Sequence, residues 1–236
     1  MHPFDTTTHF LLVRHGETAW NRPGRFRGRA DVPLSDAGRR QARLIGARLA
    51  GHPVAAVYAS PLGRATDTAW AIARHHDLEP TPCDALVDMD YGEWQGRTPR
   101  EIEAEDPAAW AYWLAQPSRA AIPGGEPVAH VRARAAHFVN DIAARRPGQT
   151  VVLVSHDMVG RALMTAVLSL PLDAIRRIAQ DNAALNVFER RNDRFVVSAI
   201  NDTGHLHTLE GEDHDATDPA PRRHGSVSGA SLSMTT

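Results

Sequence analysis

The sequence predicts an α/β protein, a single-domain layered α/β/α fold with a mostly parallel central sheet. Short, continuous apolar runs at 10–13, 54–59 and 151–154 are typical of strands covered on both faces. Each run is followed by a stretch whose apolar residues recur at helical spacing, and this alternation favours parallel strands joined by helices. Residues 8–210 contain no repeat and no linker-like break, so we expect one domain there.

The first elements follow from capping and spacing. Leu44, Ile45 and Leu49 recur at helical spacing after Ser35, which is a suitable N-cap, and Gly51 lies just beyond the helix. The three helices expected after the three apolar runs cover residues 35–50, 62–75 and 158–170.

Two further segments complete the predicted fold. Apolar stretches at 184–189 and 195–200 flank a polar turn and predict a late hairpin that adds an antiparallel edge to the sheet. The segment at about 97–125 predicts a helical insertion, which we expect to lie over the sheet. Its aromatic residues are Trp110, Tyr112 and Trp113.

The composition excludes several classes of function. All 26 basic residues are arginine, so a Schiff-base lysine and a lysine-bearing P-loop are both excluded. The single cysteine, Cys83, excludes an intrachain disulfide and a multi-cysteine zinc site and favours a reducing compartment. A net charge of −2 gives no overall attraction to nucleic acid, so we expect no nucleic-acid partner. No apolar run is long enough to span a membrane, so we expect no membrane partner. We therefore expect a cytoplasmic protein.

The two ends of the chain have the composition of unstructured segments. Residues 1–7 are predicted to be flexible. Residues 211–236 contain four acidic residues against two arginines, and their last part is rich in serine and glycine without an aromatic residue. Such a segment buries too little apolar surface to offset its ordering entropy, so we predict a disordered tail.

The residues that carry chemistry follow the apolar runs. Arg14 and His15 come directly after 10–13, and His156 follows 151–154 after one serine. Ligands of an open parallel sheet bind beyond the carboxyl ends of its strands, so neighbouring strands would bring both histidines to one edge. For either histidine alone, the alternative is a polar residue that merely ends a strand.

Arg64 falls in the first turn of the helix after 54–59, where an arginine opposes the helix dipole. One reading is a surface arginine tolerated at a cost of up to ~1 kcal/mol. The other is an anion that both the helix start and the arginine attract. Guanidinium groups match tetrahedral oxyanions in geometry and charge, so Arg14, Arg64 and two histidines would suit a phosphoryl group.

An ordered set of motifs surrounds these residues. The run Leu12–Thr18 (LVRHGET) is followed by Trp20 and Asn21. Further motifs lie at 25–28, 31–35, 60–64, 91–96, 124–126 and 155–156. In this order they resemble the histidine phosphatase superfamily, which includes the cofactor-dependent phosphoglycerate mutases. The resemblance spans residues 8 to 202 and implies phosphoryl transfer without a metal or cofactor.

The resemblance also implies roles for individual residues. His15 corresponds to the nucleophile that forms a phosphohistidine, and a carbonyl within 16–18 is expected to fix its tautomer. Arg14, Arg64 and His156 correspond to the groups that hold the phosphoryl oxygens. Asn21 corresponds to a further donor to the same oxygens.

The proton donor departs from the family pattern. Relatives usually carry a glutamate where this chain has Asp88, which has the same function with one methylene less reach. Glu93 is the reserve acid. Arg27 stands where relatives often have a neutral polar side chain, and a substrate contact and a solvent-facing position are equally open. Gly28 and Thr18 are the other candidate substrate-binding residues.

Three functions follow, and the first is a metal-independent phosphatase that acts on a small-molecule phosphomonoester through His15. The second is a phosphoglycerate mutase-type phosphotransferase, but the chain lacks lysine and has Asp157-Met158 where mutases typically follow the second histidine with Gly-Asn. The third is a non-catalytic phospholigand-binding module, which would not need all four basic groups. The sequence leaves the substrate and the oligomeric state open.

Overall fold

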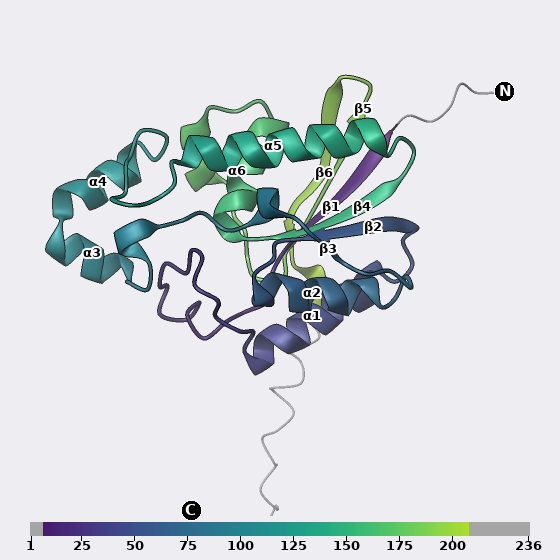
Figure 1. Cartoon of the computed structure of the whole chain (residues 1–236), viewed down its shortest axis with the longest axis horizontal. Coiled ribbons are helices and arrows are strands. Elements are labelled where there is room, and N and C mark those ends of the chain that lie inside the picture. Colours follow the sequence, from purple (N-terminus) through teal and green to yellow (C-terminus); the bar gives the residue numbers. More distant parts are fainter. Residues whose placement is uncertain (1–6, 208–236) are drawn as a thin grey trace, which may run out of the picture. The chain divides into compact units, whose positions relative to one another are not determined.

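A six-stranded sheet in the order β3-β2-β4-β1-β5-β6 forms the middle of the fold (Figure 1). The computed structural model describes residues 7–207. The strands are β1 (Thr8–Arg14), β2 (Val54–Ala59), β3 (Thr81–Pro82), β4 (Thr150–Ser155), β5 (Leu185–Arg191) and β6 (Arg194–Asp202). β1, β2, β3 and β4 pair in parallel, while β5 pairs antiparallel with both β1 and β6. The mostly parallel sheet with a late antiparallel hairpin is therefore confirmed.

Helices cover both faces of this sheet, with α1 and α2 on one face and α5 and α6 on the other (Figure 1). The helices are α1 (Asp36–Leu49), α2 (Gly63–Ala73), α3 (Pro99–Glu105), α4 (Pro107–Ala115), α5 (Val128–Arg145) and α6 (Asp157–Val167). Short 3₁₀ turns are η1 (Asp84–Leu86), η2 (Gly92–Trp94), η3 (Leu172–Arg177) and η4 (Gly204–Leu206). This arrangement confirms the layered α/β/α prediction.

Alternate residues of β1 belong to two separate apolar cores. Phe10 and Leu12 pack with the α5 and α6 side, and Phe10 stacks on Phe188 with ring centroids 5.0 Å apart. Leu11 and Val13 pack with the α1 and α2 side. Because successive strand side chains point to opposite faces, a strand covered on both sides must be apolar throughout. This is the physical reason for the continuous apolar runs in the sequence.

The start of α1 is tied to the loop that follows β1. Ser35 is the N-cap, as predicted, and its Oγ accepts a hydrogen bond from the Gly38 N–H at 3.0 Å. The same hydroxyl donates to Glu17 Oε1 at 2.8 Å. A Cβ at Gly38 would overlap the Glu17 carbonyl oxygen, so only glycine allows this close approach. The loop after β1 is thereby held in one place.

The insertion at 97–125 contains α3 and α4, but its predicted place over the sheet is wrong. Both helices lie beyond the carboxyl edge of the sheet (Figure 1). Trp110 and Trp113 pack on Trp94, with ring centroids 6.0 and 5.8 Å apart, and Trp110 also meets Phe26 at 6.3 Å. The two tryptophans thus pack against loops at the strand ends and not against a sheet face, whereas Tyr112 is exposed.

The described residues up to 206 form one compact unit. The predicted tail at 211–236 lies outside the described residues, as do residues 1–6 of the predicted flexible start. The domain boundary at residue 210 therefore stays a prediction. Within residues 7–207, no helix combines the length and apolar character needed to cross a membrane.

Candidate active site

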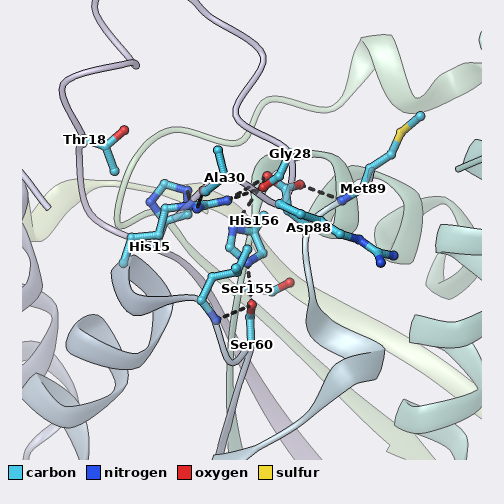
Figure 2. Close-up of polar contacts among 12 residues, drawn as sticks. His15, Thr18, Gly28, Ala30, Ser60, Asp88, Met89, Ser155 and His156 are labelled. Atoms are coloured by element: carbon cyan, nitrogen blue, oxygen red, sulfur yellow. Dashed lines mark hydrogen bonds and ion pairs between the residues drawn. The ribbon is translucent and has the colours of Figure 1, made fainter. Parts of the chain in front are cut away.

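The carboxyl ends of β1 and β4 bring two histidines together. Arg14 lies opposite Ser155 in the parallel pairing, and the His15 N–H donates to the Ser155 carbonyl at 3.0 Å. His15 and His156 leave these strands on the same edge, with ring centroids 5.1 Å apart and ring planes inclined at 58° (Figure 2). Both side chains are buried. The predicted meeting of the two histidines is what the structure shows.

The hydrogen bonds of His15 define its tautomer. Nδ1 lies 2.6 Å from the Gly16 carbonyl oxygen, which can only accept, so Nδ1 carries the proton. Nε2 therefore holds the lone pair, and it accepts from the Arg64 Nε–H at 3.3 Å. Burial, and next the neighbouring His156 and Arg64, hold the pKa of His15 well below its ordinary value. The ring is a neutral imidazole with Nε2 as its basic atom.

Arg64 enters the site from the first turn of α2 and is fully buried. Its terminal nitrogens donate to the carbonyls of Ala30 and Gly28, both at 2.8 Å, and to Asp88 Oδ2 at 3.1 Å. Gly28 has a φ of +52°, and a Cβ there would collide with the Gln95 side chain. Glycine is thus required for the turn that aims its carbonyl at Arg64. Gly28, predicted as a candidate substrate contact, positions a guanidinium in this structure.

Asp88 lies in the irregular stretch between η1 and η2 and is 3% exposed. Oδ1 accepts from the Met89 N–H at 2.9 Å, and Oδ2 lies 3.7 Å from His156 Nδ1 (Figure 2). Burial raises the pKa of the Asp88 carboxyl, whereas Arg64 opposes this shift. Glu93, the reserve acid, is exposed and borders a different surface hollow. Of the two carboxyls, only Asp88 lies among the basic groups.

His156 has one satisfied and one unsatisfied ring nitrogen. Nε2 lies 2.7 Å from Ser60 Oγ, and Ser60 directly follows β2 at the same sheet edge. Nδ1 is buried and has no hydrogen-bond partner among residues 7–207. Burial and the nearby Arg64 hold the pKa of His156 well below its ordinary value. Sequence reasoning missed Ser60 as the partner of His156, although the residue opens the motif at 60–64.

Arg14 is held by a segment that the sequence did not point to. Its Nη1 donates to the Gln180 carbonyl, while its buried Nε has no partner in the described part of the chain. Gln180 and Asn186 exchange two side-chain amide hydrogen bonds, of 2.7 and 3.0 Å. Asn182 Nδ2 donates to the His15 carbonyl at 3.2 Å. Nothing in the sequence marks these amides, because they are far from β1 along the chain.

Asn21 and Thr18 form a local pair. Asn21 Oδ1 accepts from both the backbone N–H and the hydroxyl of Thr18, each at 2.8 Å. The Asn21 Nδ2 donors are therefore left for the hollow that this residue lines. Thr18 is fully buried and does not border that hollow, so its hydroxyl orients Asn21 and is not placed for direct contact with a ligand.

Two adjoining hollows open at this edge of the sheet. The inner hollow has a volume of about 300 Å³ and the outer hollow about 270 Å³. The inner hollow is lined by Arg14, Asn21, Gly24, Arg25, Phe26, Arg27, Asp88, Tyr91 and Asp157. The outer hollow is lined by Phe26, Tyr91, Trp110, Trp113, Pro117, Asp157, Met158, Arg161, Ile175 and Arg176. Phe26, Tyr91 and Asp157 belong to both walls, so the two hollows adjoin each other.

The chemistry of the inner hollow follows from its groups. Arg14 and Asp88 line the inner hollow, and burial raises the pKa of the Asp88 carboxyl. Behind this wall, Arg64 contacts both Asp88 and His15, and the two neutral imidazoles lie side by side. These are the groups that bind and transfer a phosphoryl group at the carboxyl edge of an α/β sheet. The fold and the site thus define a phosphoryl-transfer enzyme.

Comparison with known proteins agrees with this class. The family model of the histidine phosphatase superfamily (branch 1) matches residues 10–203, and the chain belongs to that family. Phosphoserine phosphatase 1 of Hydrogenobacter thermophilus is 34% identical over 206 residues, which cover 87% of this chain and 98% of that protein. A metal-independent phosphoserine phosphatase of Arabidopsis thaliana is 32% identical, over 86% and 84% of the two chains.

The fold is also that of a solved relative. Bacillus stearothermophilus YhfR superposes with a TM-score of 0.80 at 33% identity and covers 84% of this chain and 99% of its own. Taken together with the site, these relatives identify the chain as a phosphomonoester hydrolase.

Proposed function

We propose that this chain hydrolyses small phosphomonoesters through a phosphohistidine on His15 Nε2, without a metal ion. The observation that carries the proposal is the tautomer: the Gly16 carbonyl holds the proton on Nδ1, so the lone pair of Nε2 is available for attack. The lowered pKa keeps the ring neutral across the ordinary pH range. A neutral imidazole is the nucleophilic form.

Arg14, Arg64 and His156 bind the equatorial oxygens of the phosphoryl group in this proposal. His156 Nδ1 and Arg14 Nε are buried without a partner among residues 7–207, and both become satisfied when they donate to such an oxygen. The Arg64 Nε–H moves its hydrogen bond from His15 Nε2 to the phosphoryl group and thereby frees the nucleophile. Asn21 Nδ2 is a further donor.

Asp88 is the proposed general acid and base. In the first step His15 Nε2 forms the P–N bond while the P–O bond breaks, and protonated Asp88 gives its proton to the leaving oxygen. In the second step ionised Asp88 takes a proton from water as the water oxygen displaces Nε2 from phosphorus. The raised pKa of Asp88 favours the protonated form needed at the start. Glu93 is exposed and lies at a different hollow, which makes it the weaker candidate.

The structure gives no support to the alternative of a phosphoglycerate mutase. Asp157, which stands where mutases typically have glycine, lines both hollows and forms an ion pair with Arg161. A mutase must keep its anionic intermediate bound between two phosphoryl transfers. The carboxylate of Asp157 opposes this, because like charges repel across a small cavity. A purely binding module would not need the Nε2 lone pair of His15 to face the site.

The proposed substrate is a small molecule, and the proposed compartment is the cytoplasm. Each hollow is of a size that admits a metabolite-sized leaving group. Two relatives are named for phosphoserine, so O-phosphoserine is the first substrate to test. The single Cys83 is consistent with a reducing compartment.

Trapping of the intermediate tests the mechanism. Wild-type protein mixed with radiolabelled substrate in excess chelator and quenched in base should retain label that is released in acid, as a phosphohistidine is. His15→Ala should retain none and should lose turnover while its circular dichroism is unchanged. Turnover that disappears in chelator and returns with magnesium or zinc would contradict the proposal, as would label on His15→Ala.

A further inference from the structure

Arg27 differs from the other arginines of its loop. Arg25 pairs with Glu101 at 3.1 Å, and Arg29 lies 3.6 Å from Glu126 and 3.9 Å from Asp90. Arg27 forms neither an ion pair nor a side-chain hydrogen bond with any residue in the range 7–207, although it lines the inner hollow. Its Nε is buried and has no partner. The fold therefore directs into the cavity a guanidinium that no side chain of the described range contacts as an ion pair or hydrogen bond, although Asp88 and Asp157 border the same hollow.

An unpaired buried N–H is costly, and a group that binds there recovers the lost hydrogen bond. The Nε–H and the neighbouring terminal N–H of a guanidinium form a planar fork, which fits two oxygens of a carboxylate or a phosphate. A neutral hydroxyl satisfies only one of these donors. The chemistry of Arg27 therefore selects an anion.

The position of Arg27 decides which part of the substrate this anion belongs to. Arg27 lowers the pKa of Asp88 more than any charge except Arg64. Its influence on the pKa of His15 is weaker than those of the three other basic side chains around that ring. Arg27 and Asp88 also line the same inner hollow, which His15 does not border. Because Asp88 protonates the leaving oxygen, a group beside both Asp88 and Arg27 belongs to the leaving group.

We propose that Arg27 binds a second anionic group, a carboxylate or a phosphate, on the leaving group of the substrate. The inference rests on the proposed function and narrows it to phosphomonoesters that carry a further negative charge. Arg14, Arg64 and His156 already face the phosphoryl group that is transferred. Arg27 therefore determines specificity and does not take part in bond breaking.

Three substrates with the same three-carbon leaving group separate the possibilities. Propyl phosphate has no second charge, 3-(phosphonooxy)propanoate adds a carboxylate, and 1,3-propanediol bisphosphate adds a phosphate. Each is assayed with wild type, Arg27→Gln and Arg27→Lys. Arg29→Gln is the matched control. It removes the same charge two residues further along the chain, and the Arg29 side chain does not line the hollow.

For Arg27→Gln we expect kcat/KM to fall about 10- to 100-fold on one or both charged substrates. Propyl phosphate should change less than about twofold, which also shows that the variant is folded. Arg27→Lys should recover part of the loss, because it restores charge without the fork. Arg29→Gln should leave the ratios between substrates unchanged. The charged substrate with the greater loss identifies the second anion as carboxylate or phosphate.

Two results would overturn the inference. An equal loss on all three substrates would place Arg27 on the transferred phosphoryl group, and no loss on any of them would place it in solvent. Failure of the proposed function looks different, because wild type and His15→Ala would then hydrolyse propyl phosphate at the same rate.

Discussion

The inner and outer hollows differ in how their walls are built. Four buried basic side chains at the inner end, Arg14, His15, Arg64 and His156, come from the termini of β1 and β4 and from the first turn of α2, and each is held by a backbone carbonyl or by Ser60. The outer wall comes from the loop around Phe26, from α4, from the start of α6 and from η3, and several of its residues are half-exposed. The basic groups proposed for the chemistry therefore lie at the ends of regular elements, whereas Asp88 and the loop around Phe26 lie on connections.

The two regions also differ in electrostatics. The Arg64–Asp88 pair is fully enclosed, so each charge depends on the other and on the surrounding carbonyls. The Asp157–Arg161 pair of the outer region keeps a quarter to a third of each side chain in solvent. Partly exposed ion pairs of this kind contribute only ~0 to 1 kcal/mol to the free energy of unfolding. Changes at the inner pair should therefore be severe, and changes in the outer region should be mild and selective.

The largest expected effect comes from Arg64→Gln. The variant loses the charge that faces the phosphoryl group and leaves Asp88 unpaired, so kcat/KM should fall roughly 10³- to 10⁵-fold on every substrate. Steady-state kinetics with propyl and nitrophenyl phosphate measure this. Arg74→Gln, at the exposed end of the same helix, is the control and should be near wild type. A loss below tenfold would mean that the buried guanidinium is structural only.

Asp88→Asn should separate substrates by the chemistry of their leaving groups. An alkyl phosphate needs a proton on its leaving oxygen and should lose about 10²- to 10⁴-fold in kcat. Nitrophenyl phosphate needs little protonation, so stopped-flow absorbance should show one rapid equivalent of nitrophenol. Turnover should then stall, because water is no longer activated. Glu93→Gln is the control, and a burst in that variant with normal turnover in Asp88→Asn would name Glu93 as the acid.

The buried histidines predict a loss of stability in acid. His156 has a folded-state pKa well below 6.5, so the unfolded chain binds a proton below pH 6.5 that the folded chain does not. Above pH 6.5, His156 therefore has no effect on how the free energy of unfolding depends on pH. Below pH 6.5 it lowers the free energy of unfolding by up to ~1.4 kcal/mol for each pH unit. In urea unfolding between pH 7.5 and 5.5, His156→Gln should show a shallower decline than wild type. Equal slopes would contradict a neutral buried imidazole.

The smallest effect is expected at the outer wall. Trp110→Ala should leave the turnover of propyl phosphate unchanged, because its leaving group does not reach the outer hollow. The KM for naphthyl phosphate should rise about 2- to 12-fold, the value of one aromatic contact. Trp70→Ala, an exposed tryptophan on α2, is the control. A fall in kcat on propyl phosphate would show that the outer wall also supports the catalytic groups.

Local patterns predicted most of the scaffold and the inner site. Apolar runs located β1, β2 and β4, because a strand buried on both faces must be apolar. The residues that follow those strands share one edge, since parallel strands end together. This predicts His15 beside His156, and their ring centroids lie 5.1 Å apart. The place of α3 and α4 was not predictable in the same way, because an aromatic helix packs as well on loops as on a sheet face.

The sequence by itself determined the fold class and the family, and it predicted the reactive groups, because these depend on local spacing and on the ends of adjacent strands. Only the tertiary structure decided which carboxyl joins the basic groups, which carbonyl sets the His15 tautomer and which carbonyl accepts from Arg14. It also decided that Arg27 faces the cavity unpaired. These contacts join residues far apart in the chain, and their geometry is set by packing between elements, which spacing along the sequence does not encode.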